Sequence, residues 1–309
     1  MRPARHVPLR RTPSPPAFRS EAKSEQRRLH GIMCALMKIA LTQQETAWED
    51  PAANMRACAR LAEDAARAGA ALVVFPEFTL TGFTPRPRAF ADAPGAAPQL
   101  DFFRALSRRL PLGLAFGCIR AAEPDAPQNR LVVVRNGTAL LDYAKLHSYS
   151  FGGETRAYSR GADLFTTAFE GFTLGGLICY DLRFPEVFQI AARTADVLLV
   201  IGNWPADRIE NWYTLLRARA LETQCYLVGV NRAGSGGGIA YAPSSVVFDP
   251  TGRRLTPPTP DELILCDLDP RRVREVRAAF PLRSDRRDDL YSSLVCRDYT
   301  LAATQKTGV

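Results

Sequence analysis

The first apolar segments of the chain follow a strand, helix, strand order. The run MKIALTQ (37–43) predicts a strand, and Asp50 followed by Pro51 is typical of a helix cap and a first helical turn. The continuously apolar run ALVVFPEF (71–78) predicts a strand buried on both faces. Between them, a helix that ends near Gly69 is predicted by apolar residues at intervals of three, four and seven: Met55, Cys58, Ala59, Ala62, Ala65 and Ala66.

Two hairpins are expected in the middle of the chain. A helix around residues 100–110 and the strand LGLAFGCI (112–119) precede the dipeptide NG at 136–137, which favours a tight turn between two strands. The dipeptide EG at 170–171 predicts a second hairpin, whose second strand ends at Cys179.

The second half repeats the alternation of buried strands and long helices. Its predicted elements are the strand DVLLVIGNW (196–204), the helix NWYTLLRARALETQ (211–224), the strand CYLVGVNRA (225–233), a Gly-rich loop, the hairpin SSVVFDPTGRRL (244–255) and the strand ELILCDLD (262–269). Two sheets packed face to face with helices outside would bury all these apolar faces. We therefore expect one α/β domain over residues 37–285, because no linker-like composition interrupts it.

The net charge of +8 is concentrated near the N-terminus. Residues 1–36 contain eight Lys or Arg residues against two Glu, a net of +6, which leaves 8 − 6 = +2 for the remainder. Five prolines in this segment indicate a disordered basic arm, or a start codon placed ahead of Met33 or Met37. We expect a C-terminal tail over 286–309, and a folded domain that binds neither nucleic acid nor membrane.

The cysteine pattern indicates reduced thiols. Seven cysteines are widely spaced, with no C-x-x-C pair, and the chain has only three histidines. This excludes a recognisable disulfide framework or zinc site. We therefore expect a cytoplasmic protein without a bound metal.

Cys179 stands where a buried strand gives way to the helix that Pro185 is suited to start. This position would present a nucleophile on a tight turn, although cysteine is also a common core residue. A thiol nucleophile needs a base, and His147 is the only histidine outside residues 1–36. A Cys/His hydrolase is therefore one hypothesis.

Two further residues are candidates for chemistry. Glu77 ends an apolar strand, where limited solvent access suits a carboxylate to proton transfer, although a solvated loop acid is the commoner outcome. Lys145 is the only lysine between positions 39 and 305, while the other cations there are arginines. A compact ammonium suits contact with a single developing oxyanion, although chance also leaves single lysines in hairpin strands.

Three motifs resemble the carbon-nitrogen hydrolases of the nitrilase superfamily. They are FPEF with Glu77, YAKLH with Lys145 and LICYDLRFPEVF with Cys179. The segments GNWP (202–205), RARALETQCYLVGVNR (217–232) and FDPTGRR (248–254) extend the similarity over residues 37 to about 285. The resemblance implies a four-layer αββα sandwich that pairs into homodimers or larger assemblies and needs no cofactor.

The resemblance also implies roles for the site residues. Glu77 would be the general base and then acid, Lys145 the oxyanion stabiliser and Cys179 the nucleophile. Glu154, nine residues after Lys145, matches a second glutamate with a supporting role. The backbone N–H of Tyr180 would help Lys145 to hold the oxyanion.

Within the family, CYDLRFPE and NWP are most similar to the ω-amidases, which cleave terminal amides such as 2-oxoglutaramate. Trp204 of NWP is a candidate substrate contact, and Arg183 is a candidate anchor for the substrate carboxylate, or else an ion-pair partner of Asp181 or Glu186. The segment SYSFGG (148–153) departs from the family pattern beside the pocket. Glutathione-like amides, N-carbamoyl compounds and a non-catalytic binding role remain alternatives.

Overall fold

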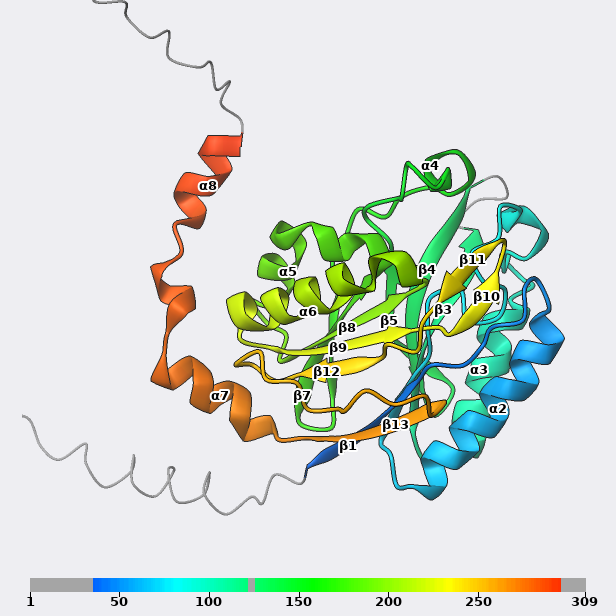
Figure 1. Ribbon diagram of the computed structural model, residues 1–309, viewed down its shortest axis with the longest axis horizontal. Helices are drawn as coiled ribbons and strands as arrows, with labels where there is room; N and C mark the ends of the chain where they lie inside the picture. The colour runs from blue at the N-terminus through cyan, green and yellow to red at the C-terminus, as the bar shows by residue number, and fades with distance from the viewer. Residues whose placement is uncertain (1–35, 122–125, 296–309) are drawn as a thin grey trace, which may run out of the picture. The chain divides into compact units, whose positions relative to one another are not determined.

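Residues 36–121 and 126–295 are described by a computed structural model (Figure 1). The larger sheet is mixed and places its first strand, β1, directly beside the edge strand β13. Its strand order is β13 (Leu263–Leu268), β1 (Met37–Thr42), β2 (Leu72–Val74), β3 (Gly113–Ala121), β4 (Pro127–Arg135) and β5 (Thr138–Ala144). Strands β1, β2 and β3 run parallel, while β13, β4 and β5 pair antiparallel with their neighbours.

The second sheet has a parallel centre with antiparallel edges. Its order is β12 (Val246–Phe248), β9 (Tyr226–Asn231), β8 (Val197–Gly202), β7 (Phe172–Ile178) and β6 (Thr166–Phe169). Strands β7, β8 and β9 run parallel and are buried along their length apart from Thr173, as a sheet covered on both faces requires. A separate two-stranded ribbon is formed by β10 (Gly234–Gly236) and β11 (Ile239–Tyr241).

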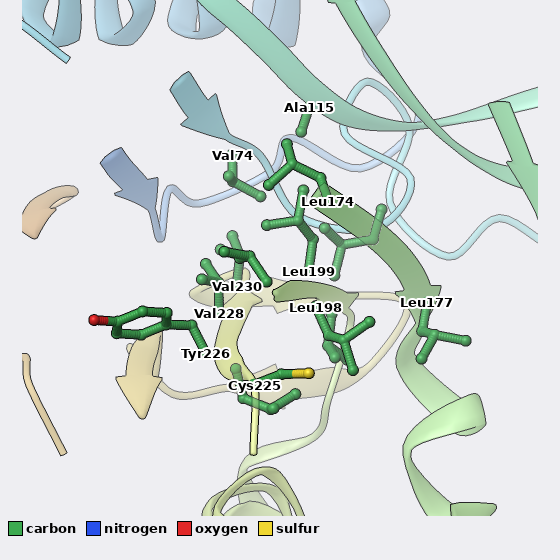
Figure 2. Close-up of a cluster of buried hydrophobic side chains, with 14 of the residues drawn as sticks. Val74, Ala115, Leu174, Leu177, Leu198, Leu199, Cys225, Tyr226, Val228 and Val230 are labelled. Atoms are coloured by element: carbon green, nitrogen blue, oxygen red, sulfur yellow. The ribbon is translucent and has the colours of Figure 1, made fainter. Parts of the chain in front are cut away.

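Helices cover the outer face of each sheet. Figure 1 shows α2 (Pro51–Arg67) and α3 (Pro98–Arg109) on one side of the sheets, and α5 (Pro185–Ala191) and α6 (Ile209–Thr223) on the other. One buried cluster lies between α2, α3 and the larger sheet, and another spans the space between the sheets and reaches α5 and α6. Figure 2 shows part of the second cluster, where Val74 and Ala115 of one sheet meet Leu174 and Leu199 of the other. The expected αββα sandwich is therefore confirmed.

Short helices connect or follow these layers. They are η1 (Pro87–Ala89), α4 (Glu154–Ala157), η2 (Cys179–Arg183), η3 (Ala206–Arg208), α7 (Pro270–Ala279), η4 (Leu282–Asp285) and α8 (Asp288–Val295). Helix α8 falls within the predicted tail, so part of that segment is helical. The predicted arm lies, apart from Leu36, outside the described residues, and the boundaries at 36 and 285 stay predictions.

Local signals explain some of the element ends. The Asp50 side chain accepts a hydrogen bond from the Ala53 N–H and caps α2, and Asn136 and Gly137 have the positive φ angles of 48° and 76° that a tight hairpin turn needs. The strand predicted over 71–78 was too long, because β2 ends at Val74 and the chain then leaves the sheet at Pro76.

Two predictions in the second half also differ from the structure. The Gly-rich loop contains the ribbon β10–β11, and the hairpin at 244–255 forms one strand, β12, with only a single bridge between Phe248 and Arg254. Over the described residues, no helix is long and apolar enough to cross a membrane.

Candidate active site

One cavity of about 280 Å³ opens where loops from both sheets meet, and it is lined by Glu77, Lys145, Glu154 and Cys179 among others. Lys145 follows the end of β5, Cys179 follows β7, and Glu77 lies three residues past β2. Strands β2 and β7 belong to the parallel parts of the two sheets, and loops beyond the carboxyl ends of such strands are the usual place for a binding crevice. Glu77, Cys179 and the nearby pair of Lys145 and Glu154 come from separate parts of the sequence and line one cavity.

Cys179 is the first residue of η2 and has a φ of 45°, a left-handed conformation that is uncommon for a residue with a side chain. The turn is fixed from below by the buried Asp181, whose carboxylate accepts hydrogen bonds from the Ile178 N–H (3.0 Å) and the Tyr143 hydroxyl (2.7 Å). Burial, and then the charge of Glu77, hold the pKa of the Cys179 thiol well above its ordinary 9.0. The thiol therefore keeps its proton at neutral pH until a base removes it.

Lys145 is a buried cation between two buried carboxylates. Its Nζ lies 3.0 Å from Oε1 of Glu77 and 2.8 Å from Oε2 of Glu154, and all three residues are at most 3% exposed. Burial alone would lower the pKa of Lys145, but the charges of Glu154 and Glu77 raise it well above the ordinary value. The site therefore holds a fixed ammonium beside the thiol.

Two asparagines, which the sequence did not single out, hold the Glu77 carboxylate in place. The Nδ2 of Asn129 on β4 donates to Oε1 of Glu77 (2.7 Å) and to Oε1 of Glu154 (3.1 Å). The backbone N–H of Asn203 donates to Oε2 of Glu77 at 2.8 Å, and its Nδ2 donates to the Glu77 carbonyl at 2.7 Å. Both oxygens of Glu77 are thus oriented by neutral donors as well as by Lys145.

The residues predicted to contact the oxyanion or the substrate line the same cavity. Tyr180, the second residue of η2, Arg183 and Trp204 all face it. The Arg183 guanidinium lies 4.9 Å from the centre of the Trp204 ring, and among the described residues it forms no ion pair with Asp181 or Glu186. Since Asp181 is already occupied by other donors, the structural ion pair considered for Arg183 does not form.

A second arginine lines the cavity and was missed in the sequence. Arg208 in η3 donates from Nη1 to the Tyr149 hydroxyl at 3.0 Å, and the Tyr149 N–H donates to Oε2 of Glu154 at 2.6 Å. The backbone carbonyl of Arg208 accepts a hydrogen bond from the indole N–H of Trp204 at 2.8 Å. The segment 148–153 therefore forms one wall of the cavity and is tied to the buried carboxylates.

His147 lies outside the cavity lining. Its Nδ1 is 2.8 Å from Oδ1 of Asp181, and its ring stacks on Phe184 with 3.8 Å between ring centres. The structure therefore does not pair this histidine with Cys179. Among the described residues, no group of three or more His, Cys, Asp or Glu side chains is placed to hold a metal ion.

Comparison with known proteins assigns the family. The sequence profile described as carbon-nitrogen hydrolase matches residues 38–278. The chain belongs to the carbon-nitrogen hydrolase family. It is therefore a hydrolase that acts on carbon–nitrogen bonds other than peptide bonds.

Relatives within the carbon-nitrogen hydrolase family cover most of the chain. It is 32% identical to omega-amidase YafV of Yersinia enterocolitica, over 81% of this chain and 96% of that protein. It is 28% identical to 2-oxoglutaramate amidase of Bacillus subtilis, over 82% and 98%, and 31% identical to deaminated glutathione amidase of Escherichia coli O157:H7, over 83% and 97%.

A solved carbon-nitrogen hydrolase has the same fold. An amidase from Nesterenkonia sp. superposes with a TM-score of 0.77 at 27% identity, covering 85% of this chain and 98% of that one.

Proposed function

We propose that this protein is an ω-amidase, which cleaves the terminal amide of a small 2-oxo dicarboxylic acid monoamide through a cysteine thioester. The observation that carries the proposal is the contact of Lys145 Nζ with both Glu77 and Glu154 in the cavity that Cys179 lines. A carboxylate, an ammonium and a thiol in one buried pocket supply a base, an oxyanion stabiliser and a nucleophile.

The first half of the reaction forms the thioester. Glu77 takes the thiol proton as the Cys179 sulfur attacks the amide carbon, and the carbonyl oxygen becomes an oxyanion. Lys145 and the backbone N–H of Tyr180 stabilise that charge, since N–H groups at the start of a helical turn lack an acceptor within the turn. The carbon–nitrogen bond then breaks, and the nitrogen leaves as ammonia with the proton from Glu77.

The second half restores the enzyme. Glu77 takes a proton from water as the water oxygen attacks the thioester carbon, and Lys145 again stabilises the oxyanion. The carbon–sulfur bond breaks, the sulfur regains the proton, and the carboxylic acid leaves. A base is needed because the pKa of Cys179 is held well above 9.0, so little thiolate exists before the substrate arrives.

Glu154 acts on this reaction through Lys145. Its two oxygens lie 3.0 and 2.8 Å from Nζ, and one of them also accepts the Tyr149 N–H. This fixes the ammonium in position, so that the lysine need not reorganise when the oxyanion develops. Glu154 is therefore proposed as a positioning residue.

The substrate end of the cavity favours a small acid. A volume of about 280 Å³ lies at the low end of the roughly 300–1,000 Å³ typical of ligand sites, which suits a five-carbon amide better than a tripeptide-sized one. Arg183 offers a guanidinium with no carboxylate partner among the described residues, and a substrate carboxylate would supply one. Both observations agree with the ω-amidase and 2-oxoglutaramate amidase relatives.

Ammonia release from a panel of amides tests the proposal. The panel contains 2-oxoglutaramate, 2-oxosuccinamate, deaminated glutathione and an N-carbamoyl amino acid, and compares the parent with Cys179→Ala. We expect the highest kcat/KM for the two 2-oxo acids and none in the variant. A higher kcat/KM for deaminated glutathione would indicate that the substrate is a glutathione-like amide. A parent that releases no ammonia from any compound would favour a non-catalytic binding protein. Homodimerisation and a cytoplasmic location stay predictions.

A further inference from the structure

A tyrosine hydroxyl faces the active cavity without a partner. Tyr241 is the last residue of β11, is only 4% exposed and lines the same cavity as Cys179 and Lys145. Among the described residues, its hydroxyl makes no hydrogen bond, and it is not one of the fully buried polar atoms, so it keeps access to the cavity that Tyr241 lines. The missing partner is therefore sought in the molecule that fills the cavity.

The ring of Tyr241 is held by a buried arginine. The Arg232 guanidinium lies 4.5 Å from the centre of the ring, and Arg232 itself is 0% exposed. Its Nη2 donates to the carbonyls of Thr46 and Ser235, both at 2.8 Å. Among the described residues it has no carboxylate within ion-pair distance, and burial lowers the pKa of its guanidinium.

The Gly-rich sequence allows the ribbon to close over Arg232. A Cβ at Gly236 would lie 2.9 Å from Nη1 of Arg232 and 2.8 Å from the ring of Trp48. A side chain at this position would push β10, and with it β11, away from the arginine. The ribbon β10–β11 therefore has a geometry that fixes Tyr241 against the cavity.

Other polar groups around the cavity already have hydrogen-bond partners or a proposed role in the reaction. Glu77 accepts from Lys145, Asn129 and Asn203, and the proposed oxyanion is met by Lys145 and the Tyr180 N–H. Burial raises the pKa of Tyr241 to about 12, so its hydroxyl remains a hydrogen-bond donor at neutral pH. Because Lys145 and the Tyr180 N–H already contact the oxygen of the scissile amide, the Tyr241 hydroxyl is suited to donate to a different oxygen of the substrate.

We infer that Tyr241 is a substrate-binding residue whose hydroxyl donates a hydrogen bond to an oxygen of the 2-oxo acid end of the substrate. The inference rests on the proposed function and adds a neutral contact to the charged contact of Arg183. Together the two residues would select an amide with oxygens at its far end over an aliphatic amide of the same length.

The test compares the parent with Tyr241→Phe, which removes one oxygen and keeps the ring over Arg232. Three five-carbon amides are used: 2-oxoglutaramate, glutaramate, which lacks the 2-oxo group, and valeramide, which lacks both the 2-oxo group and the carboxylate. We expect kcat/KM for 2-oxoglutaramate to fall roughly ten- to a hundredfold, and the fall for valeramide to be at least about tenfold smaller. Tyr213→Phe, on the outer helix α6, is the matched control and should change neither value.

The glutaramate result identifies the oxygen. A loss that matches 2-oxoglutaramate supports the carboxylate as acceptor, and a loss that matches valeramide supports the 2-oxo oxygen. Calorimetric binding of the product 2-oxoglutarate to Cys179→Ala, with and without Tyr241→Phe, measures the same contact without turnover and should show a similar weakening.

Two kinds of result would overturn the inference. Equal losses on all three amides would mean that the hydroxyl serves the reacting group or the shape of the cavity, and no loss on any would mean that it makes no substrate contact. In either case, a parent that cleaves 2-oxoglutaramate leaves the proposed function intact. A parent that cleaves neither 2-oxoglutaramate nor glutaramate would overturn the ω-amidase proposal and the Tyr241 assignment together.

Discussion

The imidazole of His147 lies against the buried carboxylate of Asp181, with 2.8 Å between Nδ1 and Oδ1. The same carboxylate accepts the N–H of Ile178, the residue directly before the nucleophile. The histidine is therefore part of the support beneath the Cys179 turn. This relationship separates the two thiol mechanisms that the sequence left open, because only one of them needs His147 in the cavity.

Replacing the histidine should leave most of the activity. In His147→Ala the backbone N–H of residue 147 still donates to Asp181, so we expect ammonia release to fall less than about tenfold. Glu77→Gln should lose at least about a hundredfold, because the base that takes the thiol proton is removed. A stably folded but inactive His147→Ala enzyme would instead support a Cys/His mechanism.

Removing the ammonium should affect both rate and stability. Lys145→Met is expected to lower kcat about a hundred- to a thousandfold, the usual effect of losing one oxyanion donor. It also leaves two buried carboxylates facing each other, so we expect the free energy of unfolding to fall by about 3 kcal/mol in urea titrations. Lys145→Arg should not restore turnover, since a planar guanidinium does not fit the place of a point charge. Turnover near that of the parent in either variant would reject the role.

Asn129 should behave as a positioning residue. It bridges Glu77 and Glu154 and does not line the cavity, so Asn129→Ala is expected to lower kcat about tenfold with little change in KM. Asn129→Asp should be worse, because it adds a third acid to the buried cluster. A change confined to KM would show that Asn129 acts on substrate binding instead.

The charge of Arg183 should matter only for an acidic substrate. We expect Arg183→Met to raise KM for 2-oxoglutaramate by about ten- to a hundredfold, the loss of a charge-assisted contact, and to affect valeramide far less. Arg183→Lys should recover part of the affinity without the paired geometry of a guanidinium. Steady-state kinetics on both amides decide the point, and equal losses on both would assign Arg183 a structural role over Trp204.

Alkaline pH should destabilise the fold through its buried thiols. Burial raises the pKa of Cys58 from 9.0 to about 12 in the folded protein. Above pH 9.0 the unfolded chain therefore binds fewer protons than the folded one, and the free energy of unfolding falls by up to about 1.4 kcal/mol per pH unit for this group. In Cys58→Ala the fall between pH 9 and 10 should be smaller by about 1 kcal/mol in urea titrations, because half of the unfolded thiols are already ionised at pH 9.0. Identical slopes would contradict the shift.

Several features were accessible from the sequence because local chemistry determines them. Asp50 caps α2, and the NG dipeptide at 136–137 turns between β4 and β5 through its positive φ angles. The αββα arrangement followed from buried strands that alternate with amphipathic helices and from the family motifs. The juxtaposition of Glu77, Lys145 and Cys179 rests on the same motifs.

The remaining site residues carry no local signal. Asn129 is the third residue of β4, and only the register of β4 against the rest of its sheet brings it to Glu77. Asn203 was inside a quoted motif, yet its role depends on a contact with a loop 126 residues away. Tyr241 lies in a segment that resembled a plain Gly-rich loop, because the pattern could not show that Arg232 would organise it. Long-range pairing determined each of these positions.

The left-handed backbone of Cys179 means that the nucleophile is also a weak point of the structure. Side chains in that conformation cost of order 1–3 kcal/mol, which glycine would largely avoid. At this position the backbone would be more stable with glycine, which has no sulfur, so stability and reactivity favour different residues.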